Sequence, residues 1–167
     1  MKKATKVLVL SLALMSSLVN SAFATETLKP FGTAAAQKSG ISTFIDVPSG
    51  CSLQYSYFGD LWYGGSGGSF STSYTAKSIA YCSEGGYTSR QRIDVIEAKA
   101  RLYSSTGGLA TSKEDKEINT SYAAIKTDDL SGKYTDGYGN HVFKNAGYLD
   151  YVPESHDTNL SQQTAPY

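Results

Sequence analysis

The sequence has few of the residues that usually build metal centres and active sites. Its 167 residues contain two cysteines and two histidines. His141 and His156 are fifteen positions apart, and this spacing matches none of the usual patterns of metal ligands. We interpret both histidines as solvated surface residues and expect no metal ion, no cofactor and no enzymatic activity.

An excess of positive charge is also lacking. Lysine and arginine number 15, and aspartate and glutamate also number 15. Without Lys2, Lys3 and Lys6, which belong to the N-terminal segment considered next, the net charge is −3 with neutral histidines. Nucleic acids and anionic lipids are bound by clustered positive charge. Neither is therefore an expected partner.

The sequence has no uninterrupted apolar run that suits a membrane span of about 30 Å. Its first 24 residues, MKKATKVLVLSLALMSSLVNSAFA, begin with lysines, continue through a short apolar run and end in the small-residue pattern Ala22-Phe23-Ala24. This layout is typical of a cleavable secretory signal peptide. We predict cleavage near Ala24 and a secreted mature chain of 143 residues that does not insert into the membrane.

Secretion bears directly on the two cysteines. Outside the cell, an even number of cysteines most simply forms disulfides. We therefore predict one bridge, between Cys51 and Cys82. In the chain-entropy model, closing this loop contributes about 3 to 4 kcal/mol, which is a large part of the stability of a small domain.

The mature sequence is rich in short runs of β-branched and aromatic residues separated by glycine, serine, aspartate and proline. This pattern is typical of antiparallel β proteins. The expected strands are Ser42–Val47, Ser52–Phe58, Ser69–Ala76, Ser78–Ser83, Arg92–Ser104, Asn119–Thr127, Gly132–Tyr138 and His141–Val152. Eight short strands at this spacing predict an antiparallel β-sandwich, with an open β-barrel as the alternative.

The strand IDVIEAKARLYSS has the clearest pattern, because apolar and charged residues alternate from Ile96 to Leu102. Ile93 and Val95 have the opposite parity, so we expect either a bulge near Val95-Ile96 or an end that is buried on both faces. Residues 105–108, 128–132 and 136–139 are expected to be hairpin connections, and SKEDKE at 112–117 a helical turn or an exposed loop.

This pattern divides the chain into four segments. They are the signal peptide (1–24), a flexible N-terminal leader (25–40), the β-sandwich domain (41–153) and a polar C-terminal tail (154–167) that we expect to fray.

The stretch YSYFGDLWYGGSGG concentrates aromatic rings beside glycines. Tyr55 and Tyr57 point to one side of the expected strand, whereas Trp62 and Tyr63 follow Gly59 in what we expect to be a loop. Exposed rings beside flexible glycines form stacking surfaces for glycans and peptides. The alternative is that the rings fill the interior of a β protein. We take Tyr55, Tyr57, Trp62 and Tyr63 as the candidate ligand-binding residues.

The second half of the mature chain contains IEAKARLYSSTGGLATSKED followed by INTSYAAIKTDDLSGKYTDGYGNHVFKNAGYLDY. It resembles small secreted proteins of Gram-positive bacteria in which a long alternating strand with an A-x-A-x-L-Y pattern precedes a hairpin and a G-x-G strand. The resemblance implies secretion and a β fold, and no particular activity. In architecture, the chain is also similar to small tyrosine-rich exported bacteriocins of the lactococcin type.

One stretch bears on catalysis. RIDVIEA is similar to the catalytic strand of one clan of retaining β-glucanases, but Arg92 occupies the position of the nucleophile. A retaining glycosidase needs two positioned carboxylates, so we interpret Asp94 and Glu97 as ordinary strand residues.

Three functional hypotheses follow from the sequence. The leading one is a secreted, non-catalytic module that binds a cell-surface glycan or another extracellular protein. The second is an exported, bacteriocin-like antagonist of neighbouring cells. The third and weakest is a small hydrolase that uses Asp94, Glu97 or His141.

Overall fold

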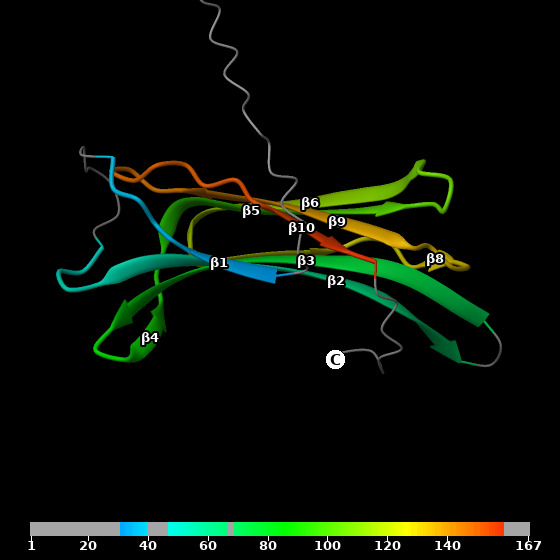
Figure 1. Cartoon of the computed structure of the whole chain (residues 1–167), viewed down its shortest axis with the longest axis horizontal. Helices are drawn as coiled ribbons and strands as arrows, with labels where there is room; N and C mark the ends of the chain where they lie inside the picture. Colours follow the sequence, from blue (N-terminus) through cyan, green and yellow to red (C-terminus); the bar gives the residue numbers. More distant parts are fainter. Residues whose placement is uncertain (1–30, 40–46, 67–68, 159–167) are drawn as a thin grey trace, which may run out of the picture.

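Two antiparallel β-sheets packed face to face form the protein (Figure 1). The computed structural model describes residues 31–39, 47–66 and 69–158. The six-stranded sheet contains β1 (Phe31–Ala35), β2 (Ser52–Ser66), β3 (Ser69–Glu84), β4 (Tyr87–Arg90), β7 (Tyr122–Lys126) and β8 (Leu130–Ser131). The four-stranded sheet contains β5 (Ile93–Tyr103), β6 (Leu109–Thr120), β9 (Asp136–Lys144) and β10 (Glu154–Asp157). The predicted β-sandwich is confirmed, and the sheets do not close into a barrel.

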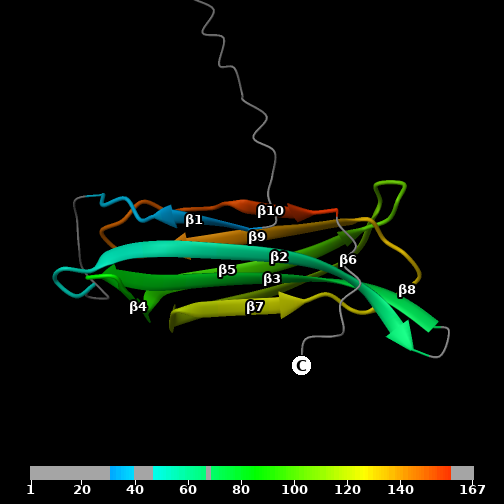
Figure 2. The same ribbon diagram turned by 60° about the horizontal axis from the view of Figure 1, so that its bottom comes forward.

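Strand β3 organises the six-stranded sheet. One of its edges pairs with β2 along the whole hairpin, from Ser52 opposite Ser83 to Ser66 opposite Ser69. Its other edge pairs with three separate strands, β4, β7 and β8 (Figure 2). Strand β1 then pairs with the free edge of β2. Residues that are distant in the sequence are thereby brought onto one surface.

The chain passes from one sheet to the other between β6 and β7. Asn119 has a positive φ of 52°, a conformation that asparagine adopts more readily than most residues. Two residues later, the carbonyl oxygen of Ser121 accepts a hydrogen bond of 3.0 Å from the amide of Ala80 in β3. The four-stranded sheet is thus joined to the six-stranded sheet by one continuous segment.

The core consists of the alternate residues that each sheet turns toward the other. The largest fully buried apolar and aromatic side chains are Tyr55, Leu61, Tyr74, Ile93, Ile96, Leu102 and Phe143. Tyr55 of the six-stranded sheet stacks on Phe143 of the four-stranded sheet with 4.6 Å between ring centroids. Full burial of one such side chain contributes about 1.5 to 3 kcal/mol, so these residues supply much of the force that holds the sheets together.

The predicted disulfide is confirmed. Cys51 and Cys82 are bonded, with 5.4 Å between their Cα atoms. Cys82 belongs to β3, and Cys51 immediately precedes β2, so the bridge lies at the end of the hairpin that is opposite to its turn. A disulfide fits an oxidising, extracellular environment. Among the described residues, no helix is long and apolar enough to cross a membrane.

Several predicted strand boundaries differ from the structure. The expected breaks at Gly59 and Lys77 are absent, because β2 and β3 are each continuous through these positions. The charged stretch 112–117 is part of β6, and the expected turn at 136–139 lies inside β9. The turn at 105–108 is confirmed, with Gly107 at a φ of 83°. No register shift occurs at Val95, and the irregularity of β5 lies at Leu102-Tyr103 instead.

Both ends of the described chain are more ordered than the sequence suggests. Part of the predicted leader forms β1, and the start of the predicted tail forms β10, which pairs with β9. A backbone hydrogen bond also joins the leader to the predicted domain, since the amide of Leu149 donates to the carbonyl of Gln37 over 2.8 Å. The predicted signal peptide, most of the predicted strand Ser42–Val47 and residues 159–167 lie outside the described residues.

Candidate functional site

Three of the four predicted ligand-binding residues, Tyr55, Tyr57 and Tyr63, lie on the face of β2 that bears the core. Tyr55 has no exposed surface and stacks on Phe143, so it is a core residue and cannot contact a ligand. Burial raises the pKa of its phenol above the usual range. Tyr57 is half-buried, and its ring lies 5.2 Å from that of His141. The alternative interpretation of these rings, as interior side chains, therefore describes Tyr55 fully and Tyr57 in part.

Trp62 and Tyr63 lie in β2 and not in a loop as predicted. Because successive residues of a strand face opposite ways, they occupy different faces of the sheet. Tyr63 lies on the face that bears the core and stacks on Phe70 near the hairpin turn, with 5.5 Å between ring centroids. Trp62 lies on the outer face, half-buried beneath the ammonium group of Lys126. The structure does not bring the four predicted residues together in one site.

The prediction that His141 is a surface residue is wrong. Its side chain is fully buried between the sheets, and burial lowers its pKa from 6.5 to about 4. Its Nδ1 atom lies 2.9 Å from the hydroxyl of Ser78, and its Nε2 atom lies 2.9 Å from the hydroxyl of Ser155. The imidazole thus bridges the six-stranded sheet and β10.

The hydrogen-bond directions in this buried network follow from proton counting. Ser78 donates its single hydroxyl proton to the carbonyl oxygen of Glu97 over 2.6 Å, so it must accept the proton on Nδ1 of His141. Nε2 of His141 consequently accepts from Ser155, which in turn accepts from the Tyr74 hydroxyl over 3.0 Å. When His141 is neutral, each of its two ring nitrogens therefore has a hydrogen-bond partner of the right kind. No carboxylate hydrogen-bonds its imidazole, and its burial keeps it from any substrate.

Glycines make the space for this network. A Cβ atom at Gly137 would lie 2.0 Å from the ring of Tyr74, and one at Gly59 would lie 1.7 Å from the Tyr74 hydroxyl. At Gly139, a Cβ atom would lie 2.4 Å from the Ser155 hydroxyl. The glycines that suggested turns in the sequence are therefore strand residues selected for close packing.

The remaining candidates for catalysis are not gathered in one site. Asp94 accepts a hydrogen bond of 2.6 Å from the amide of Ala146, and Glu97 lies 3.8 Å from the ammonium of Lys116. His156 stacks on Tyr138 with 4.0 Å between ring centroids. Within the described ranges, no group of three or more histidine, cysteine, aspartate or glutamate side chains is arranged to hold a metal ion.

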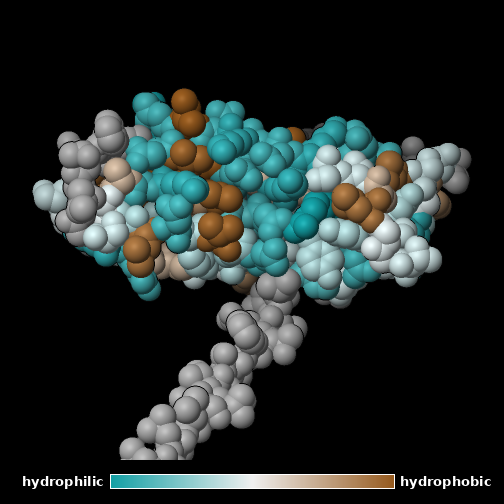
Figure 3. All heavy atoms as spheres, turned by 90° about the horizontal axis from the view of Figure 1, so that it is seen from above, coloured by the Kyte–Doolittle hydropathy of each residue, from teal (hydrophilic) through white to brown (hydrophobic). Residues whose placement is uncertain are grey.

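The outer face of the four-stranded sheet is largely hydrophilic, with a narrow band of hydrophobic residues across it (Figure 3). Its cations are paired with carboxylates. The pairs are Lys99 with Glu114 at 3.2 Å, Arg101 with Glu154 at 3.8 Å, Lys116 with Glu97 at 3.8 Å and Lys144 with Asp150 at 2.8 Å. This face carries balanced charge, which favours contact with water.

The outer face of the six-stranded sheet has a different chemistry. Residues that pair across neighbouring strands share a face, so the register defines rows that run across the sheet. The rows are Ala35-Gln54-Tyr81-Arg90, then Thr33-Ser56-Ile79-Tyr122, Phe31-Phe58-Lys77-Ala124, Asp60-Thr75-Lys126 and Trp62-Ser73. Five aromatic rings, three cations and several hydroxyl groups therefore lie on one surface, which we call the aromatic face.

Each cation on the aromatic face lies over a ring. The Lys77 ammonium is 5.7 Å from the centroid of Phe58, and the Lys126 ammonium is 5.4 Å from the centroid of Trp62. The Arg90 guanidinium is 5.1 Å from the centroid of Tyr122. Such contacts hold a long side chain in place at an exposed site for about 0.5 to 1 kcal/mol each. The rings and cations thus form an ordered surface.

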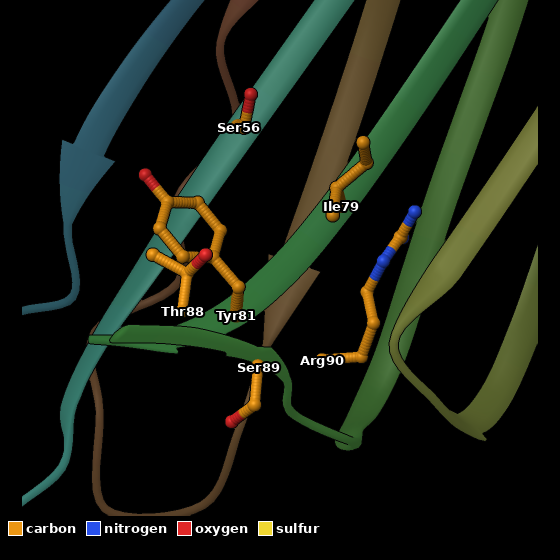
Figure 4. Close-up of a pocket in the computed structure, with 6 residues that line it drawn as sticks. All are labelled: Ser56, Ile79, Tyr81, Thr88, Ser89 and Arg90. Atoms are coloured by element: carbon orange, nitrogen blue, oxygen red, sulfur yellow. The ribbon is translucent and has the colours of Figure 1, made fainter. Parts of the chain in front are cut away.

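A shallow hollow lies at the end of the aromatic face where β4 begins. It has a volume of about 450 Å³ and is lined by Ser56, Ile79, Tyr81, Thr88, Ser89 and Arg90. Arg90 extends alongside β3 toward Ile79, whereas the side chain of Ser89 points away from them (Figure 4). The Tyr81 hydroxyl donates a hydrogen bond of 3.0 Å to the side chain of Gln54. The lining combines hydroxyl groups with one cation.

Most residues of this surface were not predicted from the sequence. Phe31 lies in the predicted leader, and Arg90 and Tyr122 are each on short strands that join β3 from distant parts of the chain. Comparison with known proteins finds no match, whether to a protein-family model, a curated protein or a solved structure. The function is therefore inferred from the surface itself.

Proposed function

We propose that this protein is a secreted, non-catalytic glycan-binding module that holds a saccharide chain against the aromatic face. The observation that carries the proposal is the row Phe31-Phe58-Lys77, in which two neighbouring rings on adjacent strands are turned to solvent. Phe31 is 63% exposed and Phe58 is 37% exposed. Contiguous exposed rings on an ordered sheet are a feature of binding surfaces.

The chemistry around the rings favours a saccharide. A sugar presents an apolar C–H face and a rim of hydroxyl groups, so it needs flat rings with hydrogen-bonding groups between them. The aromatic face supplies rings at Phe58 and Trp62, and hydroxyls at Ser56 and Thr75 in the rows between them and beside them. Because these side chains lie on sheet strands and not on loops, the surface is preorganised for a ligand.

The test is affinity electrophoresis of the mature, oxidised protein through gels that contain a neutral β-glucan, mannan or polygalacturonate, together with sedimentation on insoluble peptidoglycan. We expect retardation or co-sedimentation with at least one polymer. Phe58→Ala and Trp62→Ala should each weaken that binding by about tenfold or more, because aromatic anchors dominate binding energy at such surfaces.

A matched control is Tyr87→Ala. Tyr87 is 83% exposed but pairs with Glu84, so its ring lies on the opposite side of the sheet from Tyr81 and Arg90. This variant should bind like the unmodified protein. If no polymer is retained, or if Tyr87→Ala and Phe58→Ala weaken binding equally, the aromatic face is not a glycan site and the proposal is wrong.

A further inference from the structure

The two cations nearest the hollow, Lys77 and Arg90, have no ion-pair partner within the described residues. This contrasts with the outer face of the four-stranded sheet, where a carboxylate accompanies each of Lys99, Arg101 and Lys116. On the aromatic face, only Lys126 has such a partner, Asp129 at 2.7 Å. The aromatic face thus carries unpaired positive charge beside its exposed rings, whereas these cations of the four-stranded sheet are paired.

The nearest acidic neighbour of Lys77 does not neutralise it. Asp60 occupies the next row of the aromatic face, but the two side chains are not within ion-pair distance. Burial and the nearby Asp157 carboxylate raise the pKa of Asp60, and Lys77 opposes this shift only through space. The Lys77 ammonium consequently keeps its capacity to bind another anion.

The ring contacts orient the cations without using their donors. Arg90 lies over Tyr122, and Lys77 lies over Phe58. A guanidinium that contacts the face of a ring still has N–H groups at its edge, where a carboxylate or phosphate accepts two parallel hydrogen bonds. The hollow beside Arg90 has a volume of about 450 Å³, which is in the range of pockets that hold a small ligand or one unit of a polymer.

The two cations belong to different rows of the aromatic face. Arg90 pairs with Tyr81, and Lys77 lies four residues from Tyr81 along β3. At about 3.3 Å per strand residue, the backbone positions of the two residues are about 13 Å apart along the strand, and the guanidinium of Arg90 extends from its row toward Tyr122. Between them lie Ile79 and the Tyr122 ring, so a chain that contacts both cations also crosses apolar and aromatic surface.

We infer that the ligand is an anionic glycan, and that Arg90 and Lys77 bind its acidic groups while Phe58 and the neighbouring rings bind its sugar faces. This inference rests on the proposed function, since it specifies the ligand of the same surface. The acidic group can be a carboxylate, as in a uronic acid polymer, or a phosphate, as in a phosphorylated mannan. Both present the planar or forked oxygens that arginine recognises.

The test compares three soluble probes by isothermal titration at low and moderate salt: polygalacturonate, a phosphomannan and a neutral β-glucan. We expect at least one acidic polymer to bind more tightly than the neutral one, with affinity that falls as salt rises. Arg90→Gln should weaken acidic binding by about 10- to 100-fold, the range for loss of a charge-assisted hydrogen bond. Arg90→Lys should restore part of it.

Two further variants separate the possible failures. Lys116→Gln removes a paired cation on the opposite face, and it should leave affinity unchanged. Phe58→Ala should weaken binding of every polymer that binds. If the neutral β-glucan binds as well as the acidic polymers and Arg90→Gln has no effect, the anionic inference is wrong while the glycan-binding proposal stands. If none of the probes binds, the anionic inference is wrong, and the glycan-binding proposal is then decided by mannan and peptidoglycan in its own test. The acidic polymer that binds identifies whether carboxylate or phosphate is recognised.

Discussion

The buried imidazole of His141 makes folding stability depend on pH in a way that can be calculated. Its pKa is about 4 in the folded protein, against 6.5 for an unhindered histidine. Above pH 6.5 the side chain is neutral in both states, so pH has no effect through this group. As pH falls from 6.5 to 4, the unfolded chain takes up a proton that the folded chain does not, and stability falls. Below pH 4 both states are protonated and the loss is complete.

The size of this loss follows from the shift. A difference of about 2.5 pKa units corresponds to about 3 kcal/mol, which is a substantial fraction of the 5 to 15 kcal/mol that typically stabilises a domain. The cause of the lowered pKa is burial of the imidazole, in a site where both ring nitrogens already have partners, Nδ1 as a donor to Ser78 and Nε2 as an acceptor from Ser155. A proton on Nε2 would meet the Ser155 oxygen and force that hydroxyl to reverse its direction.

The assay is urea unfolding of the oxidised mature protein between pH 3.5 and 7.5, followed by circular dichroism, for the unmodified chain and His141→Gln. The variant is less stable at pH 7, because glutamine does not reproduce the geometry of the imidazole. The informative quantity is the difference between the two curves, since other titrating groups cancel in it. We expect this difference to shrink by about 3 kcal/mol as pH falls from 7 to 4.

A control is Ile93→Val, which shortens one buried side chain and changes no titrating group. The free energy of unfolding of this variant should change with pH in the same way as that of the unmodified chain, including the range between pH 4 and 6.5 where the two other curves differ. Parallel curves for His141→Gln across the whole range would refute the reasoning, because they would mean that His141 takes up its proton equally in the folded and unfolded states.

Three more predictions follow from the packing. Gly137→Ala should cost about 1 to 3 kcal/mol in thermal or urea unfolding, because its Cβ atom would overlap the Tyr74 ring; an unchanged midpoint would show that the ring can move aside. Replacing Cys51 and Cys82 together by serine should lower the free energy of unfolding by about 3 to 4 kcal/mol, because the sequence separation is 31 residues. The loss is measured against the unmodified protein in the same denaturant series, and a loss near zero would contradict the loop-closure estimate. Trp62 is half-buried, so acrylamide should quench its fluorescence less than that of a free indole. A glycan that binds the aromatic face should reduce this quenching further. If a glycan binds and quenching does not change, it contacts another part of the protein.

The fold class could be predicted because it depends on local signals. Alternation from Ile96 to Leu102 matches the buried and exposed faces of β5, and an even pair of cysteines outside the cell predicts the bridge. Glycine residues led to wrong predictions of where strands end. Gly59 and Gly137 suggested breaks, but they lie inside strands because a large side chain, Tyr74, packs against their backbone. A sequence does not distinguish a glycine needed for a turn from one needed for space.

The aromatic face could not be predicted from one stretch of sequence. Tyr55 and Trp62 are seven positions apart in β2. Because side chains alternate between the two faces of a strand, Tyr55 points into the core and Trp62 points outward. Phe31, Lys77 and Tyr122 join the surface only through pairing with β2 and β3. Such pairing depends on long-range register, which local propensity does not fix.

The position of the disulfide has a consequence for how the chain reaches this register during oxidative folding. The bridge from Cys51 to Cys82 and the turn at the opposite end convert the β2–β3 hairpin into a covalent ring. Thiols can be joined only when their Cα atoms come within about 7 Å, so a hairpin that has slipped along its partner places the sulfurs out of reach. Oxidation therefore favours hairpins in the native register. Chains with a shifted register keep their thiols reduced and can still change register.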